Sequence, residues 1–205
     1  LTHNMPDAPD HVARCSAING AGPPLVSSLP PIEAMPPARF AEAAAEPGTV
    51  VLDIRLYEAF GAMHVPGSWS IDLTGNFATF AGWLLPSHKR ILLVCETRTE
   101  AEQAALLLRR VGLDHTVGFL EGSMFAWARD GQPFHTVPQL STEDLSAWID
   151  GNRRFQLLDV RAPAEYAAHH IQGAVNIPAP DTRARHFELD PQLPTVVICN
   201  SGHRS

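Results

Sequence analysis

The chain carries the same ordered pattern twice, about a hundred residues apart. Leu52-Asp53-Ile54-Arg55 recurs 106 residues later as Leu158-Asp159-Val160-Arg161. Further matches follow at the same offset: Phe60 with Tyr166, His64 with His170, Val65 with Ile171, Gly67 with Gly173 and Ile71 with Ile177. Solenoid repeats have shorter periods, roughly 20–50 residues. The chain is therefore predicted to contain a duplicated domain and not a solenoid.

Helical and strand-like segments alternate within the first copy. Strands are predicted over 49–54, 91–94 and 115–120, and helices over 37–45, 76–85, 100–111 and 123–129. Such alternation with short connections is typical of a parallel sheet with right-handed crossovers. A helix over 142–149, capped by Ser141, opens the second copy. The predicted fold class is α/β, with domains over 36–135 and 139–205.

Residues 1–35 precede the first copy and are rich in proline without a clear period. A short helix is predicted from Asp10 to Ile18, ending at Gly20, and the remainder is predicted to be an extended connector. His11 and Cys15 lie four residues apart on that helix. They are interpreted as surface or packing residues and not as metal ligands.

The composition excludes several classes of function. The chain of 205 residues has a formal net charge of −7, which argues against a surface for nucleic acid or an anionic membrane. No apolar run approaches the roughly 20 residues that span a bilayer. Three scattered cysteines do not form a disulfide framework, which favours a cytoplasmic setting. The ten histidines show no ligand spacing, so neither a metal site nor a cofactor is predicted within the chain.

The strongest candidate for chemistry is the segment that follows the apolar run 196–198, which is predicted to be a buried strand. The strand ends at Cys199, and the turn that follows contains Asn200, Ser201, Gly202, His203, Arg204 and Ser205. Backbone N–H groups in such a turn form an anion-binding nest, for which Gly202 supplies the necessary backbone freedom. The positive charge of Arg204 and a helix cap at Ser205 further favour a reactive thiolate. The alternative is that Cys199 is a small buried hydrophobic residue.

Taken together, these motifs resemble those of tandem rhodanese-like (sulfurtransferase) proteins, over residues 36–205. The motifs are residues 157–161, Glu165-Tyr166, residues 170–178, the segment 199–205 and their counterparts in the first copy. The resemblance implies two three-layer α/β units with central parallel sheets. It also implies that Cys199 receives a sulfane sulfur from thiosulfate or a persulfide, carries it as a persulfide and passes it to a thiol or cyanide. Residues 200–205 would bind this small sulfur-containing anion.

Asp159 and Arg161 are expected at the end of the neighbouring strand. They either orient the cysteine loop by hydrogen bonds or form a purely structural ion pair. His203 either donates to a bound anion or is a solvated loop residue. Two other functions stay open. One is a non-catalytic docking or dimerisation module, which includes a homodimer, and the other, a minor alternative, is a phosphatase, whose related loop is one residue longer.

The corresponding loop of the first copy departs from this pattern. Aligning Cys95 with Cys199 puts Arg98 at the glycine position and Glu100 at the arginine position, while Ala59 replaces the glutamate of the motif. A side chain in place of glycine should disturb the nest, and a carboxylate near the sulfur should disfavour a thiolate. The first unit is therefore predicted to be an inactive scaffold with a buried Cys95.

Residues 1–35 also resemble the connector that follows a metallo-β-lactamase-fold domain in bacterial proteins that fuse a hydrolase or persulfide dioxygenase to two rhodanese-like units. This resemblance implies an upstream metal-binding domain outside the present sequence. Only six residues follow Cys199, whereas the first copy continues through a helix, a strand and another helix. The second unit is therefore expected to be truncated, and the 205 residues alone are expected to be inactive.

Overall fold

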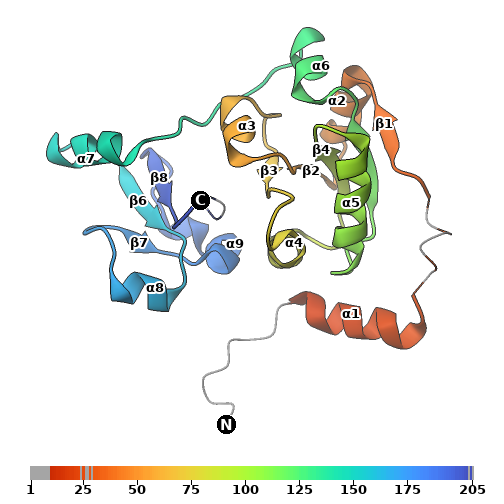
Figure 1. Cartoon of the computed structure of the whole chain (residues 1–205), viewed down its shortest axis with the longest axis horizontal. Helices are drawn as coiled ribbons and strands as arrows, with labels where there is room; N and C mark the ends of the chain where they lie inside the picture. The colour runs from red at the N-terminus through yellow and green to blue at the C-terminus, as the bar shows by residue number, and fades with distance from the viewer. Residues whose placement is uncertain (1–9, 24, 26–27, 29, 203, 205) are drawn as a thin grey trace. The chain divides into compact units, whose positions relative to one another are not determined.

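The computed structural model describes residues 10–23, 25, 28, 30–202 and 204, and the chain divides into two compact units, residues 1–137 and 138–205 (Figure 1). Each unit has its own parallel sheet with helices around it. The predicted α/β class is therefore confirmed, with a five-stranded sheet in the first unit and a smaller three-stranded sheet in the second.

The first sheet has the strand order β1-β5-β4-β2-β3, and every neighbouring pair is parallel. Its strands are β1 (Glu33–Met35), β2 (Thr49–Asp53), β3 (Trp69–Ser70), β4 (Arg90–Val94) and β5 (Thr116–Leu120). In the register of β2 and β4, Asp53 lies opposite Val94. The residues that follow both strands, including Cys95, therefore lie together at the carboxyl-terminal end of the sheet, where α/β folds bind their ligands.

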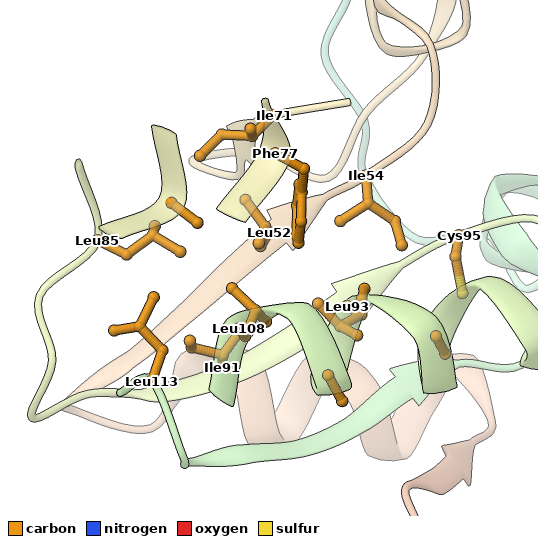
Figure 2. Packing of buried hydrophobic residues seen from close by; sticks show 14 of the residues in the cluster. Leu52, Ile54, Ile71, Phe77, Leu85, Ile91, Leu93, Cys95, Leu108 and Leu113 are labelled. Atoms are coloured by element: carbon orange, nitrogen blue, oxygen red, sulfur yellow. The ribbon is translucent and has the colours of Figure 1, made fainter. Parts of the chain in front are cut away.

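Side chains of β2 and β4 alternate between the two faces of this sheet, as the period of two in a strand requires. Leu52, Leu93 and Cys95 pack on one face, in a cluster with apolar residues of α4 (Phe77–Leu84) and α5 (Arg98–Arg109) (Figure 2). Leu92 and Val94 point to the other face, toward α2 (Pro37–Ala45) and α6 (Ser123–Arg129). The first unit thus has three layers, and its predicted helices and strands are confirmed to within two residues at each end.

The second unit has the strand order β7-β6-β8, again parallel throughout. Its elements are α7 (Thr142–Asp150), β6 (Gln156–Asp159), α8 (Pro163–Ala168), β7 (Val175–Asn176), η2 (Ala179–Asp181), α9 (Thr182–Arg185), η3 (His186–Glu188) and β8 (Thr195–Ile198). Asp159 lies opposite Ile198, as Asp53 lies opposite Val94 in the first sheet. Cys199 and Arg161 therefore follow neighbouring strands at one edge of the sheet.

The prediction that residues 196–198 form a strand is confirmed, but the prediction that this strand is buried is wrong. They do form β8, but its residues are half-buried or exposed, and Val197 is 38% exposed. The physical reason is the place of β8 at the edge of its sheet, whereas its counterpart β4 is central and buried from Ile91 to Val94. In the first unit α5 covers the sheet face that bears Leu93, and no helix in the described part of the second unit covers Val197 in that way.

The predicted connector, residues 1–35, contains a longer helix than expected and one strand that was not predicted. The predicted helix runs further, as α1 (Asp10–Ala21), and Arg14 donates to the carbonyl of Val111 at 2.7 Å. Strand β1 also lies within residues 1–35, where it pairs with β5 and follows the buried Ile32. A three-residue strand has no readable periodicity, and its pairing with β5 and the burial of Met35 are contacts with residues distant in the chain. The helices α3 (Tyr57–Ala62) and α8 also escaped prediction, because six residues are too few for a helical period to be recognised.

The repeat extends to side-chain geometry. His64 stacks on Phe60 and His170 stacks on Tyr166, with ring centroids 4.0 Å apart in both units. In each case the histidine Nδ1 lies 2.9 Å from the carbonyl oxygen of its stacking partner. The duplication inferred from the sequence is thus a duplication of structure. In the residues that the structure describes, every helix is too short or too polar to cross a membrane.

Candidate active site

The candidate site of the second unit is built on a buried ion pair at the end of β6. The Nε and Nη2 atoms of Arg161 donate to the carboxylate of Asp159 at 2.6–3.0 Å, and the backbone N–H of Arg161 donates to it at 2.9 Å. Both side chains are at least nine-tenths buried. Burial alone would raise the pKa of Asp159, but these hydrogen bonds hold that pKa below its usual range. The carboxylate is therefore ionised at neutral pH.

Arg161 reaches two further groups beyond its partner. Its Nη2 donates to the carbonyl of His169 at 2.9 Å, and its Nη1 donates to Oδ1 of Asn200 at 3.4 Å. The first contact ties the strand end to the segment after α8. The second is a long hydrogen bond to the residue that follows Cys199. Of the two readings left open for Asp159 and Arg161, this contact favours the one in which the pair orients the loop.

Glu165, in the first turn of α8, is a site residue that the sequence reasoning did not select. Its carboxylate accepts two hydrogen bonds from Arg204, at 2.8 and 2.9 Å, and one from Nδ2 of Asn200 at 2.9 Å. It also accepts from the backbone N–H of Ala162 at 3.0 Å. The hydrogen bonds from Arg204, followed by the one from Ala162, lower the pKa of Glu165 to about 2. The signal that could have identified it is its loss, as Ala59, in the copy whose loop has also changed.

The described part of the Cys199 loop (residues 199–205) curls toward its sulfur. Gly202 has a φ of +85°, the left-handed region that favours glycine, as predicted. This conformation aims the backbone N–H of Gly202 at Sγ of Cys199, 3.0 Å away. Cys199 is partly exposed and forms no disulfide. A half-accessible sulfur with an N–H donor at this distance is the arrangement that stabilises a thiolate.

The other predicted loop residues that the structure describes are Asn200, Ser201 and Arg204. Asn200 and Arg204 are both held by Glu165, so the guanidinium at the loop is paired with a carboxylate. Gly202 lies at the sulfur, and Ser201 is exposed beside it. His203 and Ser205 lie outside the described residues, so the predicted anion contact of the one and helix cap of the other stay predictions.

The Cys95 loop (residues 95–100) of the first unit has a different backbone. Helix α5 begins at Arg98, so the left-handed turn found at Gly202 has no counterpart at this position. Thr97 and Glu100 form a capping box, in which the carboxylate of Glu100 accepts from the backbone N–H groups of Glu96 and Thr97 at 2.8 and 2.9 Å. A carboxylate of the chain itself thus occupies loop amides that an anionic substrate would need.

Cys95 itself is a core residue, 1% exposed, at the end of the cluster in Figure 2. Burial, followed by the nearby carboxylates of Glu100 and Glu96, raises its pKa to about 12. The thiol form is therefore the stable one at neutral pH. The buried position predicted for Cys95 is confirmed, and the inactivity of the first unit stays a prediction.

Cys199 should react with iodoacetamide much faster than Cys95, because only a thiolate attacks and Cys95 is both buried and protonated. At pH 8 we expect Cys95 to be modified at least a hundredfold more slowly, since a pKa about four units above the pH leaves roughly one thiolate in ten thousand. Peptide mass spectrometry over a time course measures both rates in one sample. Equal rates would contradict the assignment, and unfolding in urea should abolish the difference.

Comparison with known proteins matches both units to one family. Residues 36–130 and 141–205 match the family model described as "Rhodanese-like domain". Over 70 residues, 34% of this chain and 38% of the relative, it is 36% identical to the "Putative sulfur carrier protein YrkF" of Bacillus subtilis. Over 55 residues, 27% of this chain and 44% of the relative, it is 40% identical to the "Uncharacterized protein YqhL" of the same organism. The chain spans less than half the length of either curated relative.

Among solved structures, the chain is similar to the thiosulfate sulfurtransferase of Pseudomonas aeruginosa. The match has 22% sequence identity and a TM-score of 0.40, and it covers 84% of this chain and 39% of that one.

Proposed function

Because this chain belongs to the family of rhodanese-like domains, we propose that its second unit is a sulfurtransferase with Cys199 as the nucleophile. The family match supports sulfur transfer as the kind of reaction. One curated relative, described as a putative sulfur carrier protein, supports it too. The donors, the acceptors and the residues that act are the parts that we propose.

In the first half of the reaction, the Cys199 thiolate attacks the outer sulfur of thiosulfate or of a persulfide. A sulfur–sulfur bond to Cys199 forms while the donor's own sulfur–sulfur bond breaks, and the electron pair leaves with sulfite or with a thiolate. In the second half, an acceptor thiolate or cyanide attacks the outer sulfur of the Cys199 persulfide. The electron pair of that bond returns to Cys199, so the thiolate is regenerated.

The geometry of the loop is the observation that carries this proposal. The backbone N–H of Gly202 lies 3.0 Å from the sulfur, and the Arg204 guanidinium interacts electrostatically with Cys199. The N–H group favours negative charge on the sulfur, before attack as a thiolate and after it as a persulfide, whereas the charge of Arg204 is compensated by Glu165. Asp159 and Arg161 act by orienting Asn200, and Glu165 acts by holding Arg204 and Asn200. His203 and Ser205 complete the predicted anion site.

Mass spectrometry of the intact protein tests the proposal. Incubation with thiosulfate or a small persulfide, followed by removal of the donor, should add one sulfur atom to the peptide that contains Cys199 and none to the peptide that contains Cys95. Adding cyanide should remove that sulfur and release thiocyanate. If no sulfur is gained with any donor, the chain is instead a non-catalytic docking or dimerisation module.

We also propose that the protein is cytoplasmic and that a metal-binding domain precedes these residues in the intact protein. The support is the resemblance of residues 1–35 to the connector of such fusions. Of the two alternatives, an upstream hydrolase or an upstream persulfide dioxygenase, the dioxygenase would share persulfide chemistry with the Cys199 site. Sequencing the coding region upstream of Leu1 tests this directly, because a metallo-β-lactamase-fold domain carries a recognisable cluster of histidine and aspartate ligands.

A further inference from the structure

The charged side chains that the described contacts place around the Cys199 loop form two closed pairs. Arg161 is paired with Asp159 through contacts of 2.6–3.0 Å. Arg204 is paired with Glu165 through two parallel contacts of 2.8 and 2.9 Å. Each guanidinium therefore meets one full negative charge in the bidentate geometry that matches its shape. Together the four groups carry no net charge.

Glu165 has a second effect on the loop. It also accepts from Nδ2 of Asn200, so the carboxylate is anchored by two loop residues and by the N-terminal turn of α8. A donor that arrives at the sulfur thus meets a guanidinium whose charge is already compensated. Attraction for an anion then comes from backbone N–H groups of the loop, whose dipoles act only at short range.

Charge compensation affects two kinds of donor differently. Thiosulfate carries two negative charges and must approach a sulfur that is itself a thiolate. A small persulfide without other ionisable groups, such as 2-hydroxyethyl persulfide, carries one charge at most, and it leaves as a thiolate with one charge, whereas thiosulfate leaves as the sulfite dianion. One uncompensated unit charge about 6 Å from the donor, at an effective dielectric constant of about 40, changes the rate for each extra donor charge by about tenfold.

We propose that the Cys199 site is selective for organic persulfides of low charge over thiosulfate, and that Glu165 sets this selectivity by neutralising Arg204. The inference rests on the proposed function, because it assigns the donor class of the same site. In the preferred reaction, Cys199 bonds to the outer sulfur of the persulfide and the bond between the two donor sulfurs breaks. The departing thiolate keeps the electron pair, so the chain needs no other oxidant or reductant.

The test uses the intact protein and two probes, thiosulfate and 2-hydroxyethyl persulfide. The rate of sulfur addition to Cys199 is measured at pH 8 for each donor. The persulfide-to-thiosulfate rate ratio is compared between variants, which cancels the intrinsic reactivity of the donors. Glu165→Gln leaves Arg204 uncompensated and should lower the ratio about tenfold.

Two variants make this result specific. Glu165→Gln/Arg204→Gln restores a neutral pair and should return the ratio to within about threefold of the unchanged protein. Glu188→Gln is the matched control, since it removes the carboxylate partner of Arg185 in the same unit. The Nε of Arg185 lies 2.7 Å from that carboxylate, and the pair takes no part in the described contacts of the loop. It should leave both rates unchanged.

Salt dependence provides a measurement that needs no variant. With a neutral site, the rate with thiosulfate should not fall as potassium chloride rises from about 20 to about 300 mM. Over this range the Debye length shortens from roughly 20 to roughly 6 Å. A steep fall would reveal an uncompensated cationic site and overturn the inference, as would an unchanged ratio in Glu165→Gln. The proposed function fails separately, if neither donor adds sulfur to Cys199 in the unchanged protein.

Discussion

Replacing Cys199 with serine is expected to abolish sulfur transfer by the intact protein. A serine hydroxyl is far less nucleophilic than a thiolate near neutral pH, and it cannot hold a sulfur atom as a persulfide. Thiocyanate formation from thiosulfate and cyanide should fall by about 10³-fold or more, to the uncatalysed rate, as in other covalent enzymes that lose their nucleophile. Colorimetric measurement of thiocyanate checks the result.

The matched control for this variant lies in the other unit. Cys95 occupies the equivalent position after β4, but it is 1% exposed and its pKa is raised to about 12. Cys95→Ala should therefore retain activity to within about twofold, provided that the protein folds. Activity that survives Cys199→Ser, or that is lost in a folded Cys95→Ala protein, would contradict the assignment of the chemistry to the second unit.

Asp159→Asn is expected to destabilise the second unit strongly. The change leaves the Arg161 guanidinium, whose side chain is only 9% exposed, without the charge that compensates it. Breaking a buried ion pair from one side costs about 3–5 kcal/mol in the free energy of unfolding. A typical domain has a total stability of only about 5–15 kcal/mol. Much of the second unit's stability should therefore be lost.

Hydrogen exchange followed by mass spectrometry can measure this loss in each unit separately. Peptides from β6 and β8 should lose protection in Asp159→Asn, while peptides from β2 and β4 keep theirs. Asp53→Asn is the mirror-image control, because Asp53 pairs with Arg55 in the same way in the first unit. If Asp159→Asn leaves β6 and β8 fully protected, the pair is not structural.

The same pair predicts a pH dependence. The pKa of Asp159 is lower in the folded unit than its ordinary value of 3.8, so the folded state favours the ionised carboxylate. Its stabilising effect is therefore complete above the unfolded pKa and is lost as the pH falls through the folded pKa. The second unit should lose stability below about pH 4. Asp159→Asn should weaken that dependence without abolishing it, because the pKa of Glu165 is also lowered, to about 2.

Much of this architecture could be predicted because its signals are local or repeated. The runs 49–54 and 91–94 predicted strands, since consecutive apolar residues between turn signals suit a buried parallel sheet. The turn of the Cys199 loop could be predicted from Gly202, because a φ of +85° is readily available to glycine and to few other residues. The offset between the two Asp-x-Arg motifs predicted two similar units before any contact was known.

Other features could not be read in this way, because they depend on residues that are distant in the chain. Glu165 and Arg204 are 39 positions apart, and no periodicity relates them, so the partner of the loop arginine was missed. Glu100 was expected to act on the sulfur through its charge. Its contacts with the loop amides of Glu96 and Thr97 could not be predicted, because they depend on α5 beginning at Arg98.

The sequence by itself thus determined the fold class, the duplication and the cysteine at the end of a strand, because hydrophobic period and turn chemistry act over a few neighbouring residues. The tertiary structure alone decided that β8 is an exposed edge strand and that Glu165 holds the loop arginine. Burial and charge pairing are properties of what surrounds a residue in space. That surrounding is supplied by segments whose positions are fixed only when the sheet has formed.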